Sequence, residues 1–181
     1  MESIKELLKE GYPLKEEKPT PPYKLYCDMD GVLTDFEKRF EHFTGMHPQD
    51  YEKKFGVEQF WYLIDTKIGV RFWVGMDWMP NGRQLWDFIK PYRPDLLTSP
   101  SRHDTSRLGK NLWVRNNLNP KPKVIFAYSA DKQRYANEKS ILIDDKKSNI
   151  NEWASKGGLA IRCKDGDVNH VIEKLKELGY E

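Results

Sequence analysis

Two aspartates separated by one residue carry the strongest chemical signal in this chain. Asp28 and Asp30 follow an apolar stretch that begins at Tyr23, and Gly31 comes directly after them. A strand ending in Asp-x-Asp-Gly places two acids at one edge of a sheet, with a flexible turn behind them. Carboxylates this close repel each other and normally need a cation or a shared proton. Because carboxylate oxygens suit Mg²⁺, the motif indicates a hard-metal site for phosphoryl transfer.

The same residues also fit a strand followed by a solvated acidic turn, because Asp and Gly are ordinary turn residues. Short motifs of this kind match by chance as well. The catalytic interpretation therefore depends on polar residues elsewhere in the chain. Asp35, just beyond the motif, is expected to cap a helix or brace a loop rather than bind a ligand.

Further polar residues follow later apolar runs. They are a hydroxyl pair, a lysine and an acidic pair: Thr98, Ser99, Lys132, Asp144 and Asp145. Ligands of open parallel sheets bind beyond the carboxyl ends of the strands, near the point where the strand order reverses. Acids, hydroxyls and an ammonium group are thus expected to converge at one edge, and each has a use in phosphoryl transfer.

The elements that position these residues are short strands alternating with helices. The apolar runs lack period-2 alternation, as strands buried on both faces do; they cover Tyr23–Cys27, Asp95–Leu97, Val124–Ala127, Ile141–Ile143 and Leu159–Ile161. Helical patterns cover Arg83–Ile89, Thr105–Leu118, Ser148–Lys156 with Ser148 as N-cap, and Val168–Leu178 with Asp167 as N-cap. This alternation predicts an α/β, three-layer Rossmann-like fold with a parallel five-stranded sheet.

One segment, Phe36 to Asn81, does not fit the alternation. It is too long for a connection and is rich in aromatic residues: Phe40, Phe43, Tyr51, Phe55, Phe60, Trp61, Tyr62, Phe72, Trp73 and Trp78. We expect a small helical cap, residues 37–81, inserted after the first strand of a core made of residues 22–36 and 82–181. Residues 1–21, rich in proline and charge, are expected to form an arm or linker with a short helix at Ile4–Leu8.

Composition excludes some classes of function. Lys and Arg total 30 and Asp and Glu total 28, so a net charge of +2 gives no case for a dedicated nucleic-acid or membrane-surface binder. No apolar run approaches the ~18 residues that span a bilayer, and Met1 to Lys24 lacks the apolar stretch of a signal peptide. We expect a cytoplasmic protein in which Cys27 and Cys163 are buried free thiols in strands.

The polar residues occur in a recognisable order. Asp28-Met29-Asp30-Gly31-Val32, Thr98, Lys132 and Asp144-Asp145 resemble the four motifs of the haloacid-dehalogenase-like superfamily, across residues 22–181. The chain is more closely similar to the 5′(3′)-deoxyribonucleotidases. That closer similarity lies in Leu97-Thr98-Ser99-Pro100, the stretch from Met79 to Trp86, Lys110 with Trp113, Ala130-Asp131-Lys132 and Leu142 to Asp145.

The resemblance implies a role for each motif. Asp28 would be the nucleophile that forms an aspartyl-phosphate, and Asp30 would protonate the leaving group and then deprotonate water. Mg²⁺ would be held by Asp28, the main-chain carbonyl of Asp30 and the acidic pair, with the choice between Asp144 and Asp145 left open. The phosphate would be bound by Thr98, Ser99 and Lys132, with Lys110 as a weaker candidate.

The implied substrate is a small phosphorylated metabolite, and a nucleoside monophosphate is the best guess. Most cap aromatics should form the interior of the cap, but some are expected to stack on a nucleobase; the candidates are Phe36, Phe72, Trp73 and Trp78. Alternatives are a phosphatase or mutase for sugar phosphates, a phosphatase for nucleic-acid ends, which the near-neutral charge disfavours, and a non-catalytic nucleotide-binding module. The arm could also mediate a homodimer.

Overall fold

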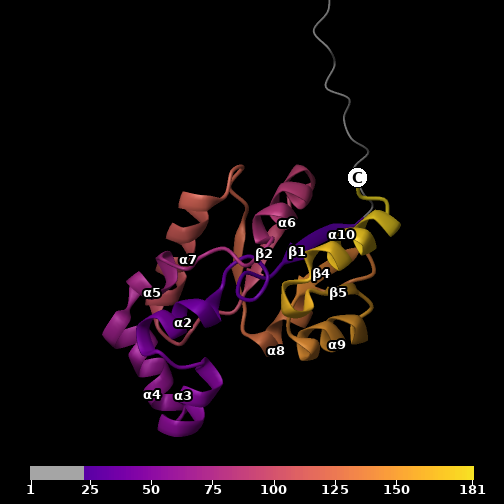
Figure 1. The fold of residues 1–181 in the computed structure, drawn as a ribbon. Helices are drawn as coiled ribbons and strands as arrows, with labels where there is room; N and C mark the ends of the chain where they lie inside the picture. The colour runs from indigo at the N-terminus through magenta and orange to yellow at the C-terminus, as the bar shows by residue number, and fades with distance from the viewer. Residues whose placement is uncertain (1–22) are drawn as a thin grey trace, which may run out of the picture.

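Five parallel strands form one sheet in the computed structural model, which describes residues 23–181 (Figure 1). The strands are β1 (Lys24–Cys27), β2 (Asp95–Thr98), β3 (Val124–Phe126), β4 (Ser140–Asp144) and β5 (Leu159–Arg162). Their spatial order is β3-β2-β1-β4-β5. The five predicted strands are confirmed to within one residue at each end. The predicted arm at residues 1–21, with its helix at Ile4–Leu8, lies outside the described residues.

Helices cover both faces of this sheet, as the three-layer prediction requires. On one face, Leu25 and Ile141 share a core cluster with residues of α6 (Gly82–Ile89), α7 (Asp104–Asn117) and α10 (Val168–Glu177). On the other face, Leu97 and Leu142 pack against Trp153 of α9 (Lys147–Ser155), which contacts the short α8 (Ser129–Lys132). Because β4 is buried along its whole length, its sequence has no polar alternation.

The four predicted sheet helices are confirmed, but one predicted cap is wrong. Asp167 caps α10 as expected, because its side chain accepts a hydrogen bond from the backbone N–H of His170. Ser148 does not cap α9, which begins at Lys147. Just before this helix, the backbone N–H of Lys146 donates instead to Asp144 Oδ1 at 2.9 Å. An acid at the end of β4 therefore orients the turn that starts the helix.

The strand order reverses between β1 and β4. The chain runs from β1 outward through β2 to β3, then crosses to β4 and β5 on the other side of β1. Cys27 pairs with Ile143, and the backbone N–H of Asp28 donates to the carbonyl of Ile143 at 2.9 Å. Asp28, which follows β1, and Asp144, which ends β4, consequently lie side by side at the place where such sheets bind ligands.

The segment between β1 and α6 is helical. It contains α2 (Phe36–Thr44), α3 (Pro48–Phe55), α4 (Val57–Tyr62), a π-helix (Leu63–Ile68) and α5 (Val70–Val74), which gather at the lower left of Figure 1. Asp35 caps α2, as expected, by accepting a hydrogen bond from the backbone N–H of Lys38 at 3.0 Å. The division of the chain into a core and a cap at residues 37–81 stays a prediction.

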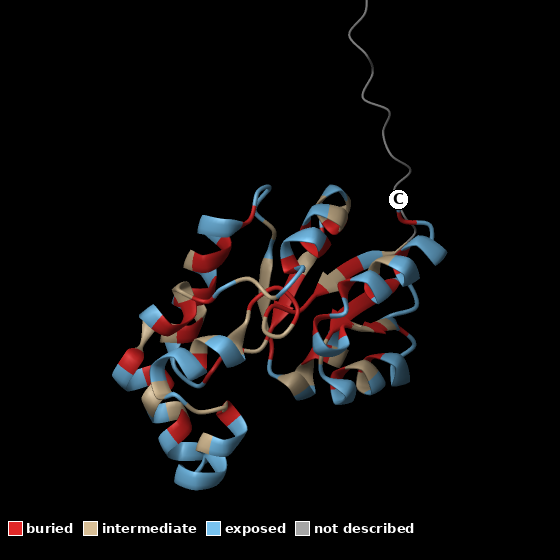
Figure 2. Ribbon diagram, in the orientation of Figure 1, coloured by how far each residue is buried: buried red, intermediate tan, exposed pale blue. Residues whose placement is uncertain are grey.

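This helical segment packs tightly on α7. A Cβ at Gly109 of α7 would collide with Trp73 Cβ and would lie 3.1 Å from the carbonyl oxygen of Val70, so only glycine permits this approach to α5. One turn later, Trp113 Nε1 donates to the carbonyl of Met76 at 2.8 Å. Buried residues therefore continue from the sheet into the helical segment, as Figure 2 shows.

Two other expectations concern cysteines and membranes. Cys27 and Cys163 are buried and free, as predicted, although Cys163 follows β5 rather than lying within it. Among residues 23–181, no helix combines the length and the hydrophobicity needed to cross a membrane.

Candidate active site

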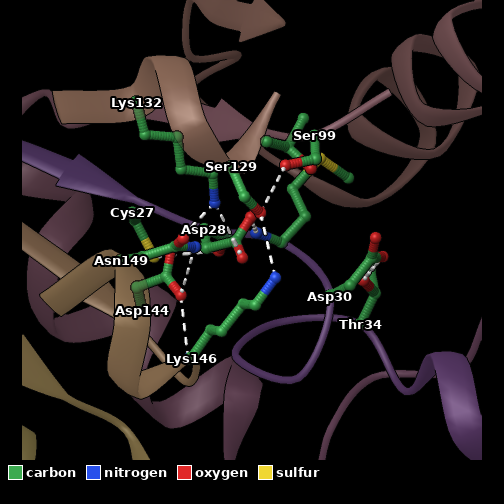
Figure 3. A network of polar contacts seen from close by, with 12 residues as sticks. Cys27, Asp28, Asp30, Thr34, Ser99, Ser129, Lys132, Asp144, Lys146 and Asn149 are labelled. Carbon is green, nitrogen blue, oxygen red and sulfur yellow. Dashed lines mark hydrogen bonds and ion pairs between the residues drawn. The ribbon is translucent and has the colours of Figure 1, made fainter. Parts of the chain in front are cut away.

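Three carboxylates meet where β1 and β4 end. Asp28, Asp144 and Asp145 each offer an oxygen within 4.8 Å of the other two. Figure 3 shows the side chains of Asp28 and Asp144. Asp28 is 7% exposed and Asp144 is fully buried, whereas Asp145 is partly exposed. The structure thus brings together the acids of two motifs that are more than a hundred residues apart in the sequence.

A buried lysine joins two of these acids. Lys132 Nζ lies 2.7 Å from Asp144 Oδ2 and 3.0 Å from Asp28 Oδ2, and its side chain is 2% exposed. Burial by itself would lower the pKa of this ammonium, but the charges of Asp28 and Asp144 outweigh that effect and raise its pKa. Lys132 is therefore a permanent cation beside the acidic group.

One lysine does not neutralise three carboxylates. Burial raises the pKa of Asp28 to about 7; Asp144, Asp30 and Asp145 act in the same direction and Lys132 opposes them. Burial and the charge of Asp144 raise the pKa of Asp145 to about 6. These raised values mean that the ionised cluster needs further positive charge. An all-oxygen donor set of carboxylates fits a hard divalent cation such as Mg²⁺.

The two acids of the Asp144-Asp145 pair have different surroundings. Asp144 accepts hydrogen bonds from Lys132, from the backbone N–H of Lys146 and from Asn149 Nδ2, which lies 3.0 and 2.9 Å from its two oxygens. Four hydrogen bonds occupy the usual acceptor capacity of a carboxylate. Asp145 lines a cleft and packs against Gly31, where a Cβ would lie 2.5 Å from Asp145 Oδ2. Asp145 is therefore the acid that is freer to bind a cation.

A second lysine occupies the other side of the site. Lys110 Nζ donates to Asp30 Oδ2 at 2.7 Å, to Thr98 Oγ1 at 2.9 Å and to the carbonyl of Ser99 at 2.8 Å. Thr34 Oγ1 donates to the other oxygen of Asp30 at 2.9 Å. The Asp30 carboxylate is therefore held outside the group of three acids. Lys110 and Thr98 are fully buried and hydrogen-bonded to each other, and the direct phosphate contacts predicted for them stay predictions.

A cleft of about 730 Å³ opens in front of the acids. Its lining combines carboxylates, hydroxyls, basic side chains and two aromatic rings: Asp28, Asp30, Asp35, Phe36, Glu37, Trp61, Met79, Pro80, Ser99, Ser129, Asp145, Lys146, Lys147, Asn149, Arg162 and Asp165, with Gly31 and Gly166. The hydroxyl oxygens of Ser99 and Ser129 lie 3.5 Å apart, and Lys146 Nζ lies 3.4 Å from Ser129 Oγ (Figure 3). The cleft therefore presents donors for an anion next to acids for a cation.

Comparison with known proteins identifies the fold. No protein-family model matches the chain, and a search of curated proteins found no match. A predicted phosphatase from Clostridium acetobutylicum, 12% identical, gives a TM-score of 0.52 over 87% of this chain and 90% of its own. A HAD-family enzyme from Bacteroides thetaiotaomicron, crystallised as a magnesium complex and 18% identical, gives 0.48 over 83% of this chain and 98% of its own. This chain therefore shares the fold of the Clostridium acetobutylicum structure.

The aromatic residues differ in their access to the cleft. Phe36 lines it, as predicted for a base-stacking residue, and so does Trp61, which was not singled out. Trp73 is 1% exposed, and Trp78 packs on Trp113 with ring centroids 5.0 Å apart; neither lines the cleft. Phe72 is fully buried. Burial argues against stacking by Trp73 and Phe72, and placement outside the cleft argues against it for Trp78.

Sequence reasoning also missed several polar residues of the site. Asn149 lies five residues after Asp144, and the start of α9 folds it back onto that carboxylate. Ser129 and Arg162 reach the cleft from α8 and from the end of β5. An Asn or a Ser near the start of a helix is common. Only the expectation that strand ends gather at one edge could have drawn attention to Arg162.

Proposed function

We propose that the protein is a magnesium-dependent phosphatase that hydrolyses a phosphomonoester through an aspartyl-phosphate on Asp28. The observation that carries this proposal is the group of three carboxylates within 4.8 Å of one another at the reversal point of the sheet, two of which are ion-paired to Lys132. The description of the Clostridium acetobutylicum structure as a predicted phosphatase agrees with it.

Asp28 and Asp145 would hold the metal, together with the main-chain carbonyl of Asp30. Mg²⁺ bound there would supply positive charge that offsets the repulsion between the carboxylates and a phosphate dianion. Asp144, whose oxygens already accept four hydrogen bonds, would keep Lys132 and Asn149 in place. The metal would also lower the raised pKa of Asp28, so that this group is ionised at neutral pH.

Asp28 is oriented for attack. The backbone N–H of Met29 donates to its Oδ1 at 2.8 Å, and Lys132 lies 3.0 Å from its Oδ2. An ionised carboxylate needs no base to attack phosphorus. The attack forms a bond between a carboxylate oxygen and phosphorus, and breaks the ester P–O bond. Water then attacks the phosphorus of the acyl phosphate, which releases inorganic phosphate and restores Asp28.

Asp30 would move the protons of both steps. It lines the cleft, and its two carboxylate oxygens accept hydrogen bonds from Thr34 and Lys110. In the first step it would give a proton to the departing alkoxide, and in the second it would take one from water. Ser99 and Ser129, with Lys146, would bind the phosphoryl oxygens, and Lys132 would stabilise the charge that develops on them.

We propose a nucleoside monophosphate as the substrate. Phe36 and Trp61 line the cleft from the helical segment, so that a planar base has aromatic side chains to stack on. Stacking of a base on an aromatic side chain contributes about 1–3 kcal/mol. A sugar phosphate would gain much less from these two rings.

Phosphate release from a panel of substrates tests the proposal. The panel would contain nucleoside monophosphates, sugar phosphates and a small aryl phosphate, each with Mg²⁺ or with EDTA. We expect release only with Mg²⁺, a preference for nucleotides, and no release by Asp28→Asn. A panel without any hydrolysed member would reject the catalytic proposal, and a preference for sugar phosphates would reject its nucleotide part.

A further inference from the structure

A buried carboxylate outside the acidic cluster connects the helical segment to the loop after β2. Asp65 lies in the π-helix Leu63–Ile68 and is 4% exposed. Its Oδ1 accepts hydrogen bonds from Ser101 Oγ at 2.7 Å and from Thr105 Oγ1 at 3.3 Å. Its Oδ2 is buried and has no hydrogen-bond partner within residues 23–181. Burying a carboxylate that is only half satisfied costs stability, so its presence needs a reason.

Ser101 is the centre of the loop that follows β2. Its backbone N–H donates to Ser106 Oγ at 2.9 Å, and its hydroxyl also lies 3.4 Å from the backbone N–H of His103. It is 4% exposed. Ser99, two residues earlier, lines the cleft and belongs to the proposed phosphate site. The place of Ser101 therefore limits where the hydroxyl and backbone N–H of Ser99 can lie.

Asp65 also contacts the start of α7. Thr105, its second partner, lies in the first turn of α7, a helix of 14 residues whose N-terminus carries partial positive charge. The same helix carries Lys110, which donates to the carbonyl of Ser99. The loop is thus held by Asp65 at Ser101 and by Lys110 at Ser99. Turns of π-helix are also frequent at functional sites.

We propose that Asp65 is a positioning residue for the phosphatase reaction: by holding Ser101, it fixes the loop that presents Ser99 to the transferred phosphoryl group. This inference rests on the proposed function. Because every substrate shares the phosphoryl group, loss of Asp65 weakens turnover of all phosphomonoesters alike, whatever their leaving group. Misplacement of such a group by about 1 Å can cost up to ~10²-fold in rate.

Kinetics of four variants and one control variant test the proposal. We expect Asp65→Ala and Ser101→Ala to lower kcat/KM by about 10- to 100-fold, equally for a nucleoside monophosphate and a small aryl phosphate. The kcat/KM of the double variant should be no lower than that of the poorer single variant, because both substitutions remove the same hydrogen bond between Asp65 and Ser101. Asp65→Asn keeps an acceptor oxygen for Ser101 and should stay within about threefold of the wild type. Asp50→Ala, an exposed acid of α3, is the matched control and should be unchanged.

Amide hydrogen exchange and inhibition by inorganic phosphate provide readouts that do not depend on turnover. In Asp65→Ala we expect faster exchange in residues 99–106 and weaker binding of phosphate in the presence of Mg²⁺, with the melting temperature well above that of the assay. Unchanged exchange in this loop overturns the proposal. So does a loosened loop with unchanged kcat/KM, a loss of activity that only follows the unfolded fraction, or an Asp65→Asn variant as impaired as Asp65→Ala.

Failure of the proposed function would look different. A wild-type protein that hydrolyses no member of the panel rejects the phosphatase, and with it a role of Asp65 in that reaction. The exchange measurement still decides whether Asp65 fixes the loop. Active wild-type protein with unaffected Asp65→Ala kinetics rejects the inference alone.

Discussion

The affinity of the site for Mg²⁺ should fall steeply as the pH is lowered. Metal binding requires ionised carboxylates and so displaces their protons. In the metal-free protein the pKa of Asp28 is raised to about 7 and that of Asp145 to about 6, chiefly by burial. The test is therefore to measure Mg²⁺ affinity and melting temperature in a pH series from 8 to 5, with and without Mg²⁺, for the wild type and for Asp28→Asn.

The magnitude follows from the two pKa values. At pH 5, displacing one proton from a group with a pKa of about 7 and one from a group with a pKa of about 6 weakens affinity by about 100-fold and 10-fold. The apparent affinity should thus fall about 10³-fold between pH 8 and pH 5, equivalent to ~4 kcal/mol. Asp28→Asn has only one of these protons to displace, so its affinity should fall by only about 10-fold over the same range.

Stability of the metal-free protein should move in the opposite direction. Both pKa values are higher in the folded protein than the ordinary value of 3.8. The stabilisation linked to these two groups is complete below pH 3.8 and is lost as the pH rises through about 6 and 7. At high pH, bound Mg²⁺ should stabilise the folded protein in place of these protons.

Thermal melts monitored by circular dichroism, with calorimetric titration of Mg²⁺, provide the measurement. At pH 8 and ~100 Kd of Mg²⁺, stabilisation of about 2.7 kcal/mol should raise the melting temperature by about 5–10 °C. At pH 5 the same concentration should have almost no effect. Asp50→Asn, on the surface of α3, should behave as the wild type. Equal Mg²⁺ affinity at pH 5 and pH 8 would refute the assignment of Asp28 and Asp145 as ligands.

Other substitutions test single features of the site. Gly31→Ala should abolish the Mg²⁺-dependent rise in melting temperature, whereas Gly45→Ala, which shares a positive φ but has nothing within 4 Å, should keep it; equal responses would contradict the predicted clash. Lys132→Met should lower metal-free stability by about 3–5 kcal/mol in urea titrations, since it strands its two carboxylate partners; no loss would contradict their coupling. Trp73→Ala should lower the free energy of unfolding by about 3–5 kcal/mol, because Trp73 is a core residue, and should leave KM for nucleotides unchanged at a temperature where the variant is folded. Trp61→Ala should raise KM for nucleotides but not for a small aryl phosphate. The opposite result for the two variants would mean that Trp73 contacts the base and Trp61 does not.

The fold and the acidic group could be predicted because the necessary information is local. Apolar runs such as Ile141–Ile143 are recognisable in isolation, and alternation with helices limits them to a parallel sheet. Once the sheet is parallel, residues that follow its strands must share an edge. The sequence alone therefore predicts that Asp28 and Asp144 lie together, as they do.

Side-chain direction could not be predicted in the same way. Lys110 and Trp73 have types suited to binding a ligand, but the close approach of α5 and α7 at Gly109 turns both inward. The contact between Asp65 and Ser101 joins residues 36 positions apart, with no signal at either end. Such details depend on how helices pack on one another, and the pattern of residues along the chain does not predict this packing.

Chemical trapping of the acyl phosphate is the most direct test of the central claim, which is that Asp28 attacks phosphorus beside a bound cation. Borohydride reduces an acyl phosphate to an alcohol, so enzyme quenched with borohydride during turnover should carry homoserine at position 28. Peptide mass spectrometry should find this product only when substrate and Mg²⁺ are both present. Full turnover with an unmodified Asp28, or with the product at another acid, would contradict the account.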